Sequence, residues 1–185
     1  LSHYSIGDKI AKILAESLID LPGVQCVDLS DNGLTDLSIV PCVQAMSQIP
    51  NLFEINLGSN TIGFAASKAI SEYLSMENCP LQRLLLTNAN IDDYECEQFM
   101  IQLKGNHALT EIDLSSNLIG SAEQLNVVRP DLITGGEAIA DVIRSNSKLK
   151  ILKLGWNMIR LHSAVDLASA LEHNKYLVYL DLSCN

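Results

Sequence analysis

The chain has 185 residues, 48% of them hydrophobic, which is enough to bury a continuous core. Its formal net charge of −10 argues against a nucleic-acid partner, because binding to a phosphate backbone needs clustered basic residues. No apolar run reaches the roughly 18 residues of a membrane span, so we expect neither a membrane-spanning segment nor a membrane partner.

The first predicted element is a helix over GDKIAKILAESLIDL, residues 7–21, with no strand before it. After it the pattern L-x-x-L-x-L-x-x-N-x-L recurs along the whole chain. Leucines at positions 1, 4 and 6 of this frame predict a short strand with one buried face, followed by a turn at position 9. The copies are VQCVDLSDNGL, LFEINLGSNTI, LQRLLLTNANI, LTEIDLSSNLI, LKILKLGWNMI and a final LVYLDLSCN that stops within the motif.

Position 9 carries asparagine in five copies and alanine, Ala89, in the third. A buried asparagine amide both donates and accepts, so stacked copies can bond the open backbone groups of neighbouring turns. We call Asn32, Asn60, Asn117, Asn157 and Asn185 the asparagine ladder. We expect the third copy to be its weak point unless water, Asn88 or Asn90 replaces the missing amide.

Between the predicted strands the apolar spacing changes to i, i+4, which predicts helices packed behind a parallel sheet. Asparagine lies three residues before the next frame in four copies, where we expect it to end a helix in the left-handed conformation. These asparagines are Asn78, Asn106, Asn146 and Asn174. Because strand-helix-strand connections are right-handed, the prediction is an α/β right-handed solenoid with the sheet on its concave face and helices on its convex face.

The motif resembles the ribonuclease-inhibitor-like class of leucine-rich repeats, and the resemblance covers essentially the whole chain. That class includes Ran GTPase-activating proteins, tropomodulins and the sensor arrays of NOD-like receptors. The resemblance implies the fold and leaves the function open, because these relatives share a scaffold and not a site.

The ladder positions 32, 60, 89, 117, 157 and 185 are separated by 28, 29, 28, 40 and 28 residues. The step of 40 indicates an insertion near 121–132, with the sequence SAEQLNVVRPDL. Residues 1–185 are therefore predicted to form a single domain of about five full repeats, plus the leading helix and a truncated final strand. We expect this domain to be a fragment of a longer array.

Residues typical of catalysis, metal binding or cofactor binding do not assemble into a motif. The four histidines form no H-E-x-x-H, and no glycine-rich phosphate-binding motif occurs. The S-x-x-K motif from Ser145 to Lys148 lies where the other repeats have the turn before a strand, so it indicates a helix-end turn and not a nucleophile. We therefore predict no enzyme activity, no cofactor, no metal and no small-molecule substrate. Five cysteines without close pairing favour a reducing, cytoplasmic setting.

Positions 3 and 5 of the frame face outward on the strands and stack in rows, and these rows are rich in charge. In one interpretation, Asp28, Glu54, Glu111, Asp113 and Asp181 form an acidic face for a basic partner. In the other, these acids pair with two bases, because Arg83 lies between Glu54 and Glu111 and Lys153 between Asp113 and Asp181. The sequence leaves both open.

The predicted binding surface is the concave sheet with its C-terminal rim. Trp156 follows a strand one coil after the insertion, next to an outward row that becomes apolar at Ile151 and Tyr179. Aromatic residues and arginine dominate interface hot spots, although Trp156 packed under the insertion is the alternative. The predicted partner-binding residues are Glu111, Asp113, Arg129, Lys153, Trp156 and Tyr179.

The predicted function is a non-enzymatic module that binds another protein, one with a basic surface in the acidic-face interpretation. The scaffold leaves two alternatives, a Ran-type GTPase-activating protein and a cytoskeletal or axonemal scaffold. No motif of the GTPase-activating family can be matched residue by residue, and the scaffold role has fold analogy alone.

Overall fold

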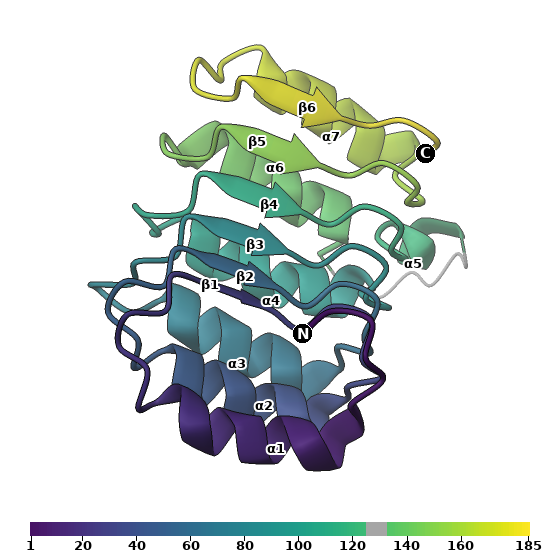
Figure 1. Ribbon diagram of the computed structural model, residues 1–185. Helices are drawn as coiled ribbons and strands as arrows, with labels where there is room; N and C mark the ends of the chain where they lie inside the picture. The colour runs from purple at the N-terminus through teal and green to yellow at the C-terminus, as the bar shows by residue number, and fades with distance from the viewer. Residues whose placement is uncertain (125–132) are drawn as a thin grey trace.

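In this computed structural model, which describes residues 1–124 and 133–185, strands and helices alternate and form two layers (Figure 1). The strands stack into one layer and the helices lie side by side in the other. This arrangement confirms the predicted α/β solenoid. The handedness of its coils stays a prediction.

Six short parallel strands within the described residues form one sheet in chain order. Their register matches the predicted frame, because position 3 of each copy lies beside position 3 of the next, as Cys26 pairs with Glu54 and Ile151 with Tyr179. The strands are β1 (Cys26–Asp28), β2 (Glu54–Asn56), β3 (Arg83–Leu85), β4 (Glu111–Asp113), β5 (Ile151–Lys153) and β6 (Tyr179–Asp181).

The long helices of the described residues cover one face of this sheet, and each packs against the next (Figure 1). They are α1 (Gly7–Leu18), α2 (Asp36–Met46), α3 (Phe64–Leu74), α4 (Asp93–Leu103), α5 (Ser121–Gln124), α6 (Gly135–Ser145) and α7 (Leu161–Leu171). The core between the two layers is one continuous cluster. The leucines at position 6 of the frame, such as Leu57 and Leu114, are fully buried in it.

Each asparagine of the ladder joins two neighbouring turns through its side chain. Asn117 donates through Nδ2 to the carbonyls of Leu86 and Leu114 at 2.9 Å, and to that of Ser115 at 3.2 Å. Its Oδ1 accepts from the N–H groups of Ala89 at 2.9 Å and Ile91 at 3.0 Å. One buried carboxamide thus satisfies five backbone groups in two coils.

At Ala89 the backbone takes over part of this role. The Ala89 carbonyl accepts a hydrogen bond from the Ile62 N–H at 3.0 Å, whereas in the first coil the equivalent N–H of Leu34 donates to the Asn60 side chain. Asn88 does not replace the missing amide, because its side chain donates outward to Ser59 Oγ at 3.4 Å. The asparagine ladder is therefore interrupted between Asn60 and Asn117.

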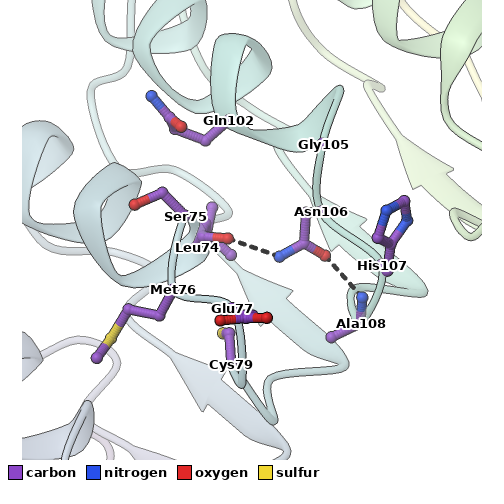
Figure 2. A pocket seen from close by; sticks show the side chains of 10 residues that line it. All are labelled: Leu74, Ser75, Met76, Glu77, Cys79, Gln102, Gly105, Asn106, His107 and Ala108. Atoms are coloured by element: carbon purple, nitrogen blue, oxygen red, sulfur yellow. Dashed lines mark hydrogen bonds between the residues drawn. The ribbon is translucent and has the colours of Figure 1, made fainter.

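The prediction of left-handed asparagines at the helix ends is wrong. Asn146 has φ −83°, and Asn78, Asn106 and Asn174 are likewise absent from the residues with positive φ. Instead, Asn106 donates to the Leu74 carbonyl at 2.8 Å and accepts from the N–H groups of Ala108 and Leu109 (Figure 2). The side chain satisfies the end of the preceding helix, so the backbone needs no left-handed turn.

The predicted insertion near 121–132 begins with a short helix, and residues 125–132 lie outside the described residues. Helix α5 starts at Ser121, four residues after the ladder position Asn117. Helices α2, α3 and α4 likewise start four residues after the ladder positions of their own coils. The carboxylate of buried Asp93 accepts from the N–H groups of Gly120 at 2.7 Å and Ala122 at 2.8 Å, and also from Gly135 at 2.7 Å. Asp93 thus connects the start of α5 to the start of α6.

Candidate protein-binding surface

The sheet face away from the helices carries a chain of ion pairs across β2 to β5. Arg83 binds Glu54 through Nη1 and Glu111 through Nε, the latter at 2.8 Å. Lys153 binds the other oxygen of Glu111 at 3.0 Å and Asp113 at 3.5 Å. Glu111 is the centre of this charge network, and its side chain is only 9% exposed.

The pKa values of the network reflect this pairing. Burial raises the pKa of Glu111, but the hydrogen bonds from Arg83 and Lys153 outweigh it, so this pKa lies below its ordinary value of 4.5. The hydrogen bond with Glu111 in turn raises the pKa of Arg83 and of Lys153. Of the two interpretations of the charged rows, the geometry favours the one in which the acids pair with the two bases, on strands β2 to β5.

Two acids of the predicted acidic face lie outside this network. Asp28 accepts from the N–H and Oγ of Ser30, at 2.9 and 2.7 Å, and Asp181 accepts from the Ser183 N–H at 2.9 Å. The predicted pairing of Lys153 with Asp181 is replaced by its pairing with Glu111 and Asp113. Of the excess negative charge on the strand rows, two charges thus lie at the ends of the sheet, and one remains in the network, where three acids face two bases.

We expect Glu111→Gln to lower the free energy of unfolding by about 1–2 kcal/mol near neutral pH, because it removes the charge shared by Arg83 and Lys153. A depressed folded-state pKa stabilises the fold above the unfolded-state pKa, and this contribution is lost as the pH falls through the folded-state pKa. The gap between wild type and variant should therefore narrow as the pH falls below 4.5.

Urea unfolding at a series of pH values measures this gap. The control is Glu72→Gln, because Glu72 is exposed and lies 4.0 Å from Lys68, and we expect no measurable gap for it. A gap for Glu111→Gln that stays constant into strong acid would contradict the role of its charge.

Trp156 lies at position 8 of its frame, in the turn that follows β5. Its side chain is 67% exposed, and its φ is 57°. The same position is also left-handed in the other coils, where it carries a small residue in each: Asp31, Ser59, Asn88, Ser116 and Cys184. Tryptophan is the costly choice for a left-handed turn, so neither packing nor backbone conformation explains it here.

The other predicted binding residues fall into three groups. Glu111, Asp113 and Lys153 are in direct contact within the charge network. Tyr179, half-exposed on β6, pairs with Ile151 of β5, so the outward row is apolar at this end. Arg129 lies outside the described residues.

Two hollows lie on opposite edges of the third coil. The first, of about 350 Å³, is lined by the turns after α3 and α4, where Asn106 is held by its backbone bonds (Figure 2). The second, of about 330 Å³, lies at the rim that carries Trp156 and is lined by the turns after the strands. We call it the rim hollow, and its lining is Gly33, Ser59, Asn60, Thr61, Asn88, Asn90, Ser116, Asn117 and Leu118.

Two features were not predicted from the sequence, the rim hollow and an aromatic contact between α3 and α4. Phe64 and Tyr94, at the starts of α3 and α4, are about half-exposed, and their ring centroids lie 5.6 Å apart. The sequence signal for the hollow is the loss of the ladder asparagine at Ala89 with asparagines on both sides. That signal predicts a weakened turn, and the volume becomes visible only when neighbouring coils are stacked.

The chain is similar in sequence to several curated proteins. It is 24% identical to "NACHT, LRR and PYD domains-containing protein 3" of Rattus norvegicus, over 100% of this chain and 22% of that protein. It is 30% identical to "NACHT, LRR and PYD domains-containing protein 12" of Homo sapiens, over 76% of this chain and 12% of that protein. For "Ribonuclease inhibitor" of Sus scrofa the identity is 28%, over 69% of this chain and 28% of that protein.

The chain thus spans less than a third of the length of these relatives, and no protein-family profile matches it. Among solved structures it is similar to "Leiomodin-1 Actin-Binding Site 2 (ABS2)", with a TM-score of 0.53 and 18% identity, over 91% of this chain and 76% of that one. It is also similar to the tropomodulin C-terminal domain of Caenorhabditis elegans, with a TM-score of 0.51 and 14% identity, over 91% of this chain and 82% of that one. At these identities the likeness shows the fold alone. Within the described residues, no helix has the length and apolarity to cross a bilayer.

Proposed function

We propose that this chain, a leucine-rich-repeat protein of the ribonuclease-inhibitor-like class, is a non-enzymatic module that binds another protein through its strand face and C-terminal rim. The leucine-rich-repeat relatives support protein interaction in general. The site we propose consists of Trp156, Tyr179 and the neighbouring charges Glu111, Asp113 and Lys153. It requires no cofactor and no catalytic step.

One observation carries the proposal, the exposed Trp156 in a left-handed turn. A non-glycine residue held in this region costs of the order of 1 kcal/mol, and an exposed indole in water gains nothing from it in the free protein. Tryptophan is also enriched among the few residues that dominate interface energies. Burial of this indole by a partner explains both the residue type and its position.

The charges beside Trp156 suggest the chemistry of the partner. Asp181 forms no ion pair among the described residues, and its pKa is lowered by the hydrogen bonds from Ser183. The chain as a whole has a formal net charge of −10. A partner with a basic surface around an apolar contact is therefore part of the proposal. We also propose that the protein works in a reducing, cytoplasmic setting, because all five cysteines are free.

Replacing Trp156 with asparagine tests the proposal, because Asn88 occupies the same left-handed position two coils earlier. Loss of a hot-spot tryptophan costs about 2 kcal/mol or more, so we expect the partner to bind about thirtyfold more weakly. We also expect the fold to be as stable as the wild type or slightly more stable, since asparagine tolerates this conformation.

The experiment compares the proteins that immobilised wild type and variants capture from a cytoplasmic extract by quantitative mass spectrometry, and then measures the dissociation constant of the strongest specific partner. Leu37→Ala is the control, because Leu37 is similarly exposed, 65%, but lies on α2. Unchanged capture by Trp156→Asn combined with Asp113→Asn would rule out this surface.

A further inference from the structure

We infer that the rim hollow binds an uncharged side-chain carboxamide of the partner, next to the group that covers Trp156. This inference extends the proposed function and rests on it, because the proposed function is what makes the bound group part of a protein. The hollow has about 330 Å³, the lower end of the range of binding pockets. It is built from turns that follow successive strands at one edge of the sheet.

The lining of the rim hollow contains no charged residue, although the protein is strongly acidic. Apart from Leu118, which is partly exposed, its exposed side chains are hydroxyls and carboxamides, groups that donate and accept hydrogen bonds. A charged ligand would find no opposite charge here, and an apolar ligand would leave these polar groups unpaired. An uncharged group that both donates and accepts satisfies the lining best.

The polar side chains of the rim hollow are available for binding. Among the described residues, the side chains of Thr61, Asn90 and Ser116 make no hydrogen bond, and Asn88 makes only the long bond to Ser59. They contrast with Asn60 and Asn117, whose amides are fully engaged with the backbone beneath them. The hollow therefore has a fixed floor and free polar groups at its opening.

The turn of the third coil contributes two asparagines to the rim hollow. Asn88 and Asn90, on the two sides of Ala89, are both left-handed, with φ 53° and 60°. In the second coil only the position-8 residue, Ser59, is left-handed, whereas the first coil has Asp31 and Gly33 and the fourth has Ser116 and Gly120. A second left-handed residue therefore also occurs beside an intact ladder asparagine, Asn32, and the third coil is set apart by the missing ladder amide at Ala89.

The rim hollow is continuous with the proposed binding surface. Ser116 lines the hollow, and its N–H donates to the carbonyl of Gly155, the residue before Trp156, at 2.8 Å. Adjacent turns follow the strand spacing of about 4.8 Å, so a segment that covers Trp156 reaches the hollow within a few residues. One partner segment can therefore place an apolar group on Trp156 and a polar group in the hollow.

Three probes of the same shape test the inference without any partner: the N-acetyl N-methylamides of asparagine, aspartate and leucine. Each is titrated into the ¹⁵N-labelled chain, and the amide signals of Ser59, Asn88, Asn90 and Ser116 are followed. The three probes share the same backbone amides, so a difference between them reports the side chain. We expect saturable shifts for the asparagine probe and about tenfold weaker binding of the aspartate probe, whose side chain is charged, and of the leucine probe, whose side chain forms no hydrogen bonds. No saturable shift, or equal shifts for all three, would overturn the inference.

Asn90→Asp adds a charge at the hollow while keeping a residue that tolerates the left-handed conformation. It should weaken the asparagine probe about tenfold, whereas Asn78→Asp, the same change at an exposed asparagine outside the hollow, should not. An unaffected titration of Asn90→Asp would also overturn the inference. Because no partner is used, these results are independent of the Trp156 capture experiment, so failure of the rim hollow as a site can be told apart from failure of the proposed function.

Discussion

Replacing Asn117 with alanine is expected to lower the free energy of unfolding by about 3–4 kcal/mol. The variant leaves the N–H groups of Ala89 and Ile91 without their side-chain acceptor inside the fold. It also removes the donor to the carbonyls of Leu86 and Leu114. A buried backbone group left unpaired costs about 1–3 kcal/mol, and relaxation of the turns recovers part of this sum.

Asn117 follows Ala89 in the ladder, so we expect a second effect of Asn117→Ala, on the cooperativity of unfolding. With both amides absent, two successive ladder positions are empty, and the coils before Ala89 lose the coupling that the ladder gives them to those after Asn117. Because stability in a repeat array is a sum of coil and neighbour-interface contributions, the urea transition should also become less cooperative, with a lower m value.

The matched control for this variant is Asn78→Ala, because Asn78 is exposed and makes none of the ladder bonds. Its effect should stay within about 0.5 kcal/mol, the usual range for surface substitutions. Urea unfolding followed by circular dichroism measures both. A loss below about 1 kcal/mol for Asn117→Ala would show that the ladder amides contribute little beyond solvent exchange.

The sequence predicted the fold of this chain to the level of individual strand pairs. Each frame fixes which residues point inward, and equal spacing fixes which residues stack, so Cys26 beside Glu54 and Ile151 beside Tyr179 follow from counting. Register is predictable here because a slip by one residue would turn the leucines outward.

Local backbone conformation was less predictable, because one residue type can satisfy a turn in more than one way. Asn146 was expected to use a left-handed backbone and instead uses its side chain, which donates to the Leu103 carbonyl and accepts from the N–H groups of Lys148 and Leu149. Both solutions pair the end of a helix. The choice depends on where the next coil places its groups, which the sequence of one coil does not contain.

The charges of the candidate surface show a different limit. The sequence placed Arg83 and Lys153 among the acids but left open whether the acids face a partner or each other. Side-chain reach decides this: Lys153 extends to Glu111 and Asp113 on β4 rather than to Asp181 on β6. The exposure of Trp156 likewise needed the structure, because a tryptophan beside an insertion can be packed or free.

The second large effect is expected for Asp93→Ala, which should lower the free energy of unfolding by about 3–5 kcal/mol. The carboxylate of Asp93 is nearly fully buried, and its three backbone donors, Gly120, Ala122 and Gly135, would lose a charged acceptor. Hydrogen bonds to charged groups contribute about 1.5–3 kcal/mol each, and movement of the freed segments recovers part of the loss.

The equivalent acid in α2 separates the two roles of Asp93. Asp36 accepts from the N–H groups of Gly63 at 2.8 Å and Ala65 at 2.9 Å, so it fixes one helix start, whereas Asp93 fixes the starts of both α5 and α6. We therefore expect Asp36→Ala to cost about 1–2 kcal/mol less than Asp93→Ala.

Native-state hydrogen exchange gives the decisive measurement, because it reports local opening as well as global stability. In Asp93→Ala the amides of Gly120 and Gly135 should exchange together and faster than those of β4 and β5. In Asp36→Ala the amides of Gly63 and Ala65 should do so, while those of Gly120 and Gly135 stay protected. Unchanged protection of Gly135 in Asp93→Ala would mean that the packing of α6 against α4 and α7 holds this segment without the carboxylate.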